Sequence, residues 1–233
     1  SAWVVSSAIS IRNNWDVVLP NYGLSYVFVE RLADLERIRP GDFVLVTLNK
    51  LGSYQKQIKK WIKRHNQKIC LTLDESDEIS NPDSQRAKAS LDCFRRCRMK
   101  LLTTGTSTRN NISEFAPQLE LLYNNSINMI TWCRTTYYCD REDNSINSEN
   151  NAYYGRPIPA YKPGYALFSA CHLPEKTTVF GMTERTQDIY NADELNELLA
   201  KTVITRTFEE ITGKEIRRIH QVPLQFLPEE RAV

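Results

Sequence analysis

The chain has 233 residues, 41% of them hydrophobic, and a formal net charge of +2. The hydrophobic content is enough for one buried core, or for a core and an appendage. The small net charge excludes the overall basic character of many autonomous nucleic-acid binders, so any contact with nucleic acid must come from a local face. No apolar run approaches the ~20 residues that cross a bilayer, and we expect no membrane partner.

Six cysteines occur at positions 70, 93, 97, 133, 139 and 171, and no two of them form a CxxC pair. Structural zinc sites need closely spaced cysteine and histidine ligands, so a metal site is the weaker interpretation of this pattern. Reduced and mostly buried thiols are the stronger interpretation, and they indicate an intracellular protein.

Short apolar segments predict strands in the first part of the chain, at residues 2–8, 26–29, 42–48 and 68–73. The segment 42–48 is almost continuously apolar, as a parallel strand buried on both faces requires. A helical pattern at 54–63 is amphipathic, and we expect its lysines to form a solvated face. Strands separated by helices predict an α/β fold with a parallel sheet.

Two acidic residues, Asp74 and Glu75, follow directly after the strand predicted at 68–73. A helical stretch at 84–98 then leads to a second short strand, which ends in the turn Thr104-Gly105-Thr106. Ligands of open α/β sheets bind at the carboxyl ends of the strands. Carboxylates placed there can hold a hydrated Mg²⁺ and polarise a water molecule, although an Asp-Glu pair can also be a solvated turn.

The run LTLDESDEIS, followed by RMKLLTTGTSTRN, resembles motifs II and III of superfamily-two helicases, and most of all the Swi/Snf-type DNA translocases. Those proteins commonly carry a DEAH-like box and, about 30 residues later, the sequence LLTGTPxxN. Two motifs depart from the pattern, because DESD stands in place of DEAH and Ser107 in place of the proline.

The resemblance implies a three-layer RecA-like lobe, with a parallel sheet and helices on both faces. It implies that Asp74 holds Mg²⁺ through water and that Glu75 orients or deprotonates the water that attacks ATP. It also implies a set of residues that couple hydrolysis to DNA contact: Ser76, Asp77, Thr104, Gly105, Thr106 and Asn110.

The resemblance also implies two segments that contact the phosphate backbone of duplex DNA through hydroxyl and backbone donors. In the first segment these residues are Ser6 and Ser7, and in the second the residue is Thr47. An equally weighted interpretation of Ser6 and Ser7 is the cap of a helix that begins near Arg12.

The second half of the chain has a different character. Residues 126–190 are rich in Tyr and Asn, and we expect a loop-rich insertion there rather than a surface that stacks on bases. A helix is predicted from Asn191 to about Gly213, and the rest of 191–233 resembles a linker toward a second RecA-like lobe. Residues 1–125 would then be a partial first lobe, with motifs Ia, Ib, II and III.

The sequence G-x-x-x-x-G-K-[ST], which cradles phosphates, does not occur in the 233 residues. We therefore expect a fragment that binds no cofactor tightly by itself, from a parent that uses ATP and Mg²⁺ with DNA and a second lobe as partners. Whether the chain itself is an enzyme stays open. Three alternatives remain: a degenerate lobe that is a DNA- or protein-binding scaffold, a DNA-binding module that uses its tyrosines, and, least favoured, a Cys/His hydrolase.

Overall fold

The computed structural model describes residues 1–65, 69–106, 112–123, 132–140, 142–156, 164–177, 183–185 and 188–213. The chain divides into two compact units, Ser1–Leu198 and Leu199–Val233. Within the described residues, no helix is both long and apolar enough to cross a membrane. The domain boundaries expected at residues 125 and 190 stay predictions.

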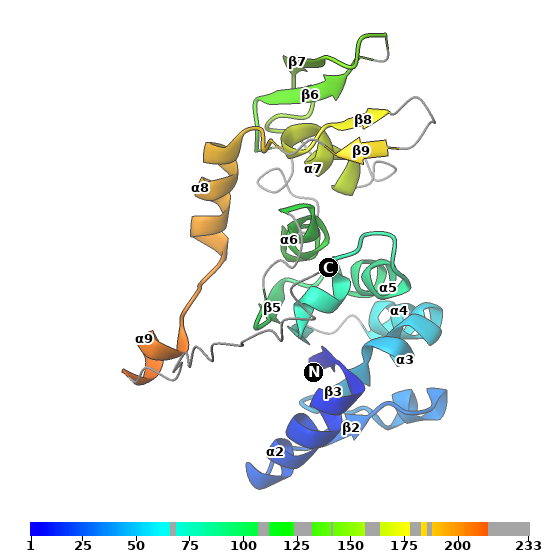
Figure 1. Ribbon diagram of the computed structural model, residues 1–233. Coiled ribbons are helices and arrows are strands. Elements are labelled where there is room, and N and C mark those ends of the chain that lie inside the picture. The colour runs from blue at the N-terminus through cyan, green and yellow to red at the C-terminus, as the bar shows by residue number, and fades with distance from the viewer. Residues whose placement is uncertain are drawn as a thin grey trace, which may run out of the picture. The chain divides into compact units, whose positions relative to one another are not determined.

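A five-stranded parallel sheet organises the first unit (Figure 1). Its order is β2 (Tyr26–Phe28), β3 (Phe43–Thr47), β1 (Ala2–Ser6), β4 (Cys70–Asp74) and β5 (Met99–Thr103). All neighbouring pairs are parallel. The predicted strands are therefore confirmed, and all of them end at the same edge of the sheet.

One face of the sheet packs against four helices: α3 (Leu48–Ser53), α4 (Gln55–His65), α5 (Gln85–Phe94) and α6 (Phe115–Tyr123). Trp3 lies at the centre of this core, and its ring centroid is 5.5 Å from that of Trp61 and 5.6 Å from that of Phe94. Burying side chains of this size stabilises the fold by about 1.5–3 kcal/mol each.

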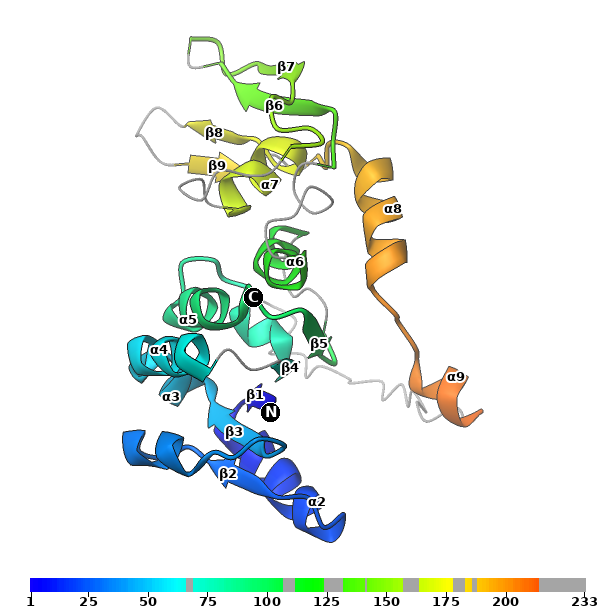
Figure 2. The same ribbon diagram turned by 180° about the vertical axis from the view of Figure 1, so that it is seen from behind.

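The other face packs against the segment that follows β1. This segment contains α1 (Ala8–Ser10), the π-helix η1 (Ile11–Trp15) and α2 (Asp16–Asn21), and it buries Ile11 and Leu19 on Val4 and Leu45. Seen from behind, α2 lies on the opposite side of the strands from α3 and α4 (Figure 2). Helices on both faces make the three layers of a RecA-like fold, as predicted.

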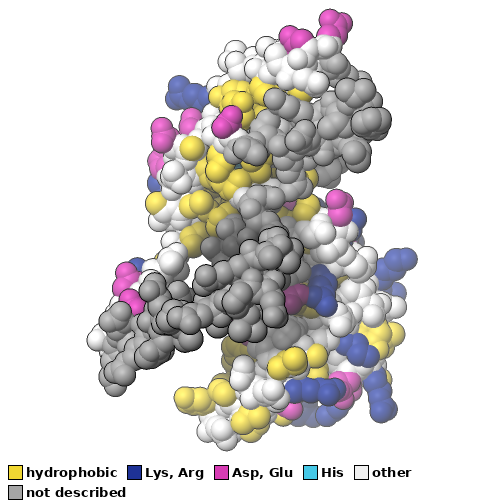
Figure 3. All heavy atoms as spheres, viewed as in Figure 1, with side chains coloured by type: hydrophobic (Ala, Val, Ile, Leu, Met, Phe, Trp, Pro, Cys, Tyr) yellow, Lys and Arg dark blue, Asp and Glu magenta, His cyan; other side chains and the backbone are white. Residues whose placement is uncertain are grey.

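The solvated lysine face of α4 is present: Lys56, Lys59, Lys60 and Lys63 are exposed. Figure 3 shows basic side chains over this part of the molecule. Lys59 also forms an ion pair with Asp92 of α5. Three short 3₁₀ helices complete this part of the unit: η2 (Leu32–Arg37), η3 (Ser76–Ile79) and η4 (Ile112–Glu114).

The described part of 126–190 contains two antiparallel hairpins and a helix. β6 (Thr135–Cys139) pairs with β7 (Ile146–Asn150), and β8 (Glu175–Thr177) pairs with β9 (Thr183–Arg185). The helix between them is α7 (Gly164–His172). Short regular elements thus occur in a stretch whose sequence shows no clear period.

The helix predicted from Asn191 to Gly213 is in fact two helices, α8 (Ala192–Thr202) and α9 (Phe208–Thr212). Between them, Val203, Ile204 and Thr205 are β-branched residues, which lose side-chain freedom in a helix. Thr207 then begins α9 with a capping box to Glu210. Gly213 ends α9 in the left-handed conformation (φ 66°), as the sequence predicts.

Candidate functional site

The carboxyl ends of three neighbouring strands bring the predicted acidic residues and the predicted turn together. Asp74 is the last residue of β4, Ser6 the last of β1 and Thr103 the last of β5. Asp74 and Thr103 are register partners across the β4–β5 pair. The arrangement expected from the sequence, with the loops after β4 and β5 at one edge of the sheet, is therefore present.

The carboxylate of Asp74 accepts four hydrogen bonds. Its Oδ2 atom accepts from Ser10 Oγ (2.7 Å), Ser6 Oγ (3.1 Å) and Trp15 Nε1 (3.1 Å). Its Oδ1 atom accepts from Thr103 Oγ1 (2.9 Å). Burial raises the pKa of the Asp74 carboxyl, but these four hydrogen bonds outweigh burial, so the pKa lies below its ordinary value. Asp74 is therefore held as an anion.

The segment after β1 is shaped so that it reaches Asp74. Ser7 caps α1, because its Oγ accepts a hydrogen bond from the backbone N–H of Ser10 (3.1 Å). The chain then continues as the π-helix Ile11–Trp15, a form that is rare and often found at functional sites. Trp15 is half-buried against the small core around Ile11, and its indole N–H is directed at Asp74.

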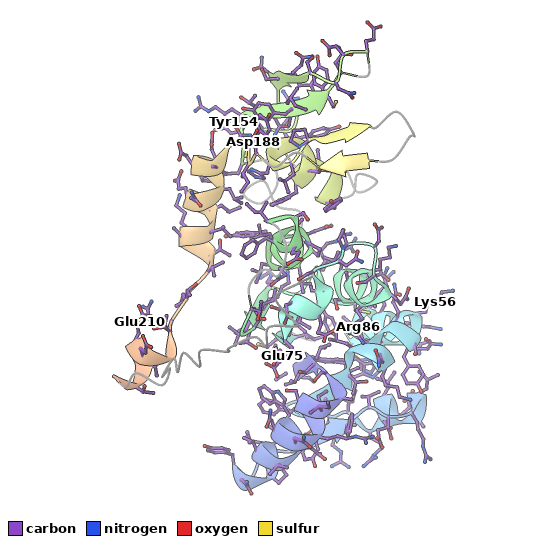
Figure 4. The ribbon with its side chains drawn as sticks, viewed as in Figure 1. Lys56, Glu75, Arg86, Tyr154, Asp188 and Glu210 are labelled. Carbon is purple, nitrogen blue, oxygen red and sulfur yellow. The ribbon has the colours of Figure 1, made fainter. Side chains whose placement is uncertain are left out.

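Glu75 differs from Asp74 in both backbone and surroundings. Its backbone is left-handed, with φ 56° and ψ 53°, which costs a non-glycine residue about 1–2 kcal/mol. Its side chain is exposed (Figure 4), and no hydrogen bond of this side chain is found among the residues that the structure describes. Backbone strain of this kind is typical of functional positions. Because the side chain is exposed, the Glu75 carboxylate is accessible to water.

A second set of hydrogen bonds joins the acidic loop to the Thr-Gly-Thr turn. Thr104 Oγ1 donates to Asp77 Oδ1 (2.8 Å) and accepts from the backbone N–H of Thr106 (3.1 Å). Ser76 is buried and donates from Oγ to Oε1 of Gln118 in α6 (3.0 Å). Asp77 thus contacts the turn directly, whereas Ser76 contacts Gln118 of α6.

Gly105 and Asn110 are the remaining two residues of the predicted coupling set. Gly105 is exposed, and Asn110 lies outside the described residues. No periodic or motif signal in the sequence singles out Gln118, Ser10 or Trp15 as partners of the acidic loop. The coupling role of the whole set stays a prediction.

The residues predicted to contact phosphate are used in different ways. Ser6 is fully buried and donates to Asp74, so its hydroxyl is not presented to solvent. Ser7 and Thr47 are helix caps, and Thr47 Oγ1 accepts from the backbone N–H of Lys50 (3.2 Å). Ser7 is thus a helix cap, although the helix that it caps begins at Ala8 and not near Arg12, and phosphate contact at these positions stays a prediction.

The six cysteines are free thiols, and the part of the chain that the structure describes holds no group of three His, Cys, Asp or Glu residues suited to a metal ion. One buried pair was not expected from the sequence: Cys133 Sγ lies 3.7 Å from His172 Nε2. A hydrogen bond with Cys171 lowers the pKa of Cys133, against the effect of burial and with further help from His172.

A parallel sheet covered on both faces, with acidic and hydroxyl side chains where its strands end, defines a RecA-like α/β protein. The chain belongs to a family within this class: residues 13–226 match the SNF2-related domain, which confirms the resemblance found in the sequence.

Among solved structures, the chain is similar to the Sulfolobus solfataricus SWI2/SNF2 ATPase core in complex with dsDNA. The identity is 18% and the TM-score 0.37, over 53% of this chain and 24% of that chain. The chain therefore spans about a quarter of the length of that protein chain. A search of curated proteins found no match.

The family implies Mg²⁺, and Asp74 fits a water-mediated contact with this ion. Mg²⁺ sites in nucleotide-hydrolysing proteins often use one or two carboxylates, with waters and substrate phosphates as the other ligands. A carboxylate oxygen has two lone pairs, and Asp74 Oδ1 accepts one hydrogen bond in the described structure, from Thr103. The Oδ1 atom can therefore accept a second hydrogen bond, from a Mg²⁺-bound water, while Oδ2 is occupied.

Proposed function

We propose that the chain contributes to an ATP-dependent motor that acts on DNA. Membership of the SNF2-related family supports this class of function. The observation that carries the proposal for this chain is the position of Asp74 and Glu75 at the end of β4, beside the turn that follows β5. Both loops are thereby placed where a nucleotide binds in an open α/β sheet.

The two acidic residues have separable roles in this proposal. Asp74 would hold hydrated Mg²⁺ through Oδ1, and Glu75 would orient the attacking water or take its proton. The bound Mg²⁺ supplies charge neutralisation to the transferred phosphoryl group. The chain itself supplies positioning, which accounts for much of the rate of such reactions. The anionic state of Asp74 and the exposure of Glu75 support this division.

We further propose that the partner is duplex DNA, bound through its phosphates by the ends of β1 and β3, near Ser7 and Thr47, and that a second RecA-like lobe completes the motor. Support for this comes from the helix starts at Ser7 and Thr47, because helix N-termini suit phosphate contacts. The hydrogen bond from Thr104 to Asp77 would link ATP hydrolysis to DNA contact, because a hydroxyl beside a carboxylate can change partners.

The test is Glu75→Gln in the natural protein that contains these 233 residues, with DNA-stimulated ATP hydrolysis as the measurement. The substitution keeps the size of the side chain and removes its basicity, and we expect a loss of at least about 100-fold. Glu142→Gln is the matched control, because Glu142 is exposed in the turn between β6 and β7. Hydrolysis by Glu75→Gln at the control rate would refute the role of Glu75.

A second function, a non-catalytic scaffold, is favoured by one observation: the 233 residues contain no G-x-x-x-x-G-K-[ST] sequence. The isolated chain would then bind DNA with an affinity that falls with salt but does not respond to ATP. Nucleotide-dependent DNA affinity of the natural protein would decide for the motor, and its absence for the scaffold.

A further inference from the structure

Three of the four donors on Asp74 come from one continuous segment, residues 6–15. These donors are the hydroxyls of Ser6 and Ser10 and the indole N–H of Trp15, and all three converge on Oδ2. The fourth donor, Thr103, comes from another strand and binds the other oxygen. The two oxygens of one carboxylate are thus treated differently by the surrounding protein.

This asymmetry fixes the orientation of the carboxylate. Oδ2 has two lone pairs and already faces three donors, so no further ligand can bind there without displacing a protein group. All of the donors are neutral, so they stabilise the negative charge of Asp74 without cancelling it. The oxygen that remains open, Oδ1, is the one turned toward β5.

The donors are held by the core and by the local chain geometry. Ser10 is 9% exposed and Ile11 is fully buried, so the segment cannot rotate about its own axis without uncovering the core. Within the π-helix, one extra residue per turn changes the direction of the side chains that follow. Trp15, the last residue of the π-helix, is thereby brought to a carboxylate 59 positions away in the sequence.

We propose that Ser10 and Trp15 are positioning residues for Asp74: their hydrogen bonds to Oδ2 hold the carboxylate with Oδ1 open, so that a hydrated divalent cation is placed at the end of β4. The cation half of this proposal rests on the proposed function, whereas the positioning half does not. The consequence is a direct link between the cation and the segment that begins at Ser7, where DNA contact is proposed.

The positioning half is tested by the titration of the Asp74 carboxyl carbon, followed by NMR in the 233-residue chain from about pH 6 to about pH 3. Trp15→Phe keeps the aromatic packing and removes the N–H donor, so we expect the titration midpoint of Asp74 to move to higher pH. Trp3→Phe is the matched control, because Trp3 Nε1 is buried and no described residue accepts a hydrogen bond from it.

Ser10→Ala is a second variant that removes a donor with little change in packing. A midpoint that moves in Trp15→Phe and in Ser10→Ala, but not in Trp3→Phe, supports the positioning role. A midpoint that stays at the wild-type value in both variants would overturn it. Circular dichroism identifies a variant that fails to fold, in which case the other variant decides.

The cation half is tested with Mn²⁺, a paramagnetic substitute for Mg²⁺, added to the same chain. We expect Mn²⁺ to broaden the indole N–H resonance of Trp15 in the wild type and to leave it sharp in Asp74→Asn. An indole resonance that Mn²⁺ leaves sharp in the wild type would overturn the cation half. Loss of ATP hydrolysis is not used here, so failure of this test differs from failure of the proposed function.

Discussion

The hydrogen bond between Thr104 and Asp77 gives the most direct prediction, because the adjacent residue offers a matched comparison. Thr104→Val and Thr103→Val remove the same hydroxyl from neighbouring positions and replace it with a methyl group of similar size. Thr104 is half-buried and donates to Asp77, which is 7% exposed. Thr103 is exposed and donates to Asp74, which keeps three other donors.

The two substitutions should therefore differ in their cost. A hydrogen bond to a charged, buried acceptor contributes about 1.5–3 kcal/mol, and Thr104→Val also removes the acceptor of the Thr106 N–H. For Thr103→Val the loss should be about 0.5–1 kcal/mol, because Thr103 is exposed and water can replace its hydroxyl.

The assay is urea unfolding of both variants and the wild type, with the free energy of unfolding taken by linear extrapolation. Equal slopes with denaturant would show that the comparison concerns the same transition. A loss in Thr104→Val no larger than that in Thr103→Val would refute the reasoning, because it would mean that Asp77 gains nothing from the turn after β5. DNA-stimulated ATP hydrolysis by the natural protein with Thr104→Val or Thr103→Val would then test whether the contact of Thr104 with Asp77 also couples ATP hydrolysis to DNA contact.

Two further predictions concern titrating groups. The pKa of Asp74 is lowered on folding, so Asp74 contributes stability that is present above its unfolded pKa of about 3.8 and is lost as the pH falls through the lower folded value. Urea unfolding should therefore show that Asp74→Asn lowers the free energy of unfolding at neutral pH, and that this loss becomes smaller in acid. A loss that does not change with pH would contradict this. Hydrogen bonds from Cys171 and His172 lower the pKa of Cys133, whereas burial raises the pKa of Cys93 to about 12. As the pH is raised, the ultraviolet absorbance of the first thiolate to form should therefore be lost in Cys133→Ala and persist in Cys93→Ala. The opposite result would contradict the lowered pKa of Cys133.

Local sequence was sufficient for the strands, their common edge and the two loops that follow β4 and β5. A nearly continuous apolar run such as 42–48 is typical of a strand that is buried on both faces of a sheet, and parallel strands joined by helices all end at one edge of that sheet. The positions of Asp74 and Thr104 follow from these two facts together with the motif. The cap Ser7 and the left-handed Gly213 were also accessible, because caps depend on residues three or four positions away. The cap at Thr207 was not predicted, because the sequence favoured one continuous helix there.

Contacts between distant segments were decided only by the tertiary structure. Ser10 and Asp74 are 64 positions apart, and Ser76 and Gln118 are 42 apart. No local pattern specifies such pairs, because they depend on which strands become neighbours and on where the π-helix turns Trp15. The sequence by itself determined which side chains reach the edge of the sheet. The order of the strands and the packing of η1 on β1 determined that Asp74 has one oxygen held by three donors and the other left open.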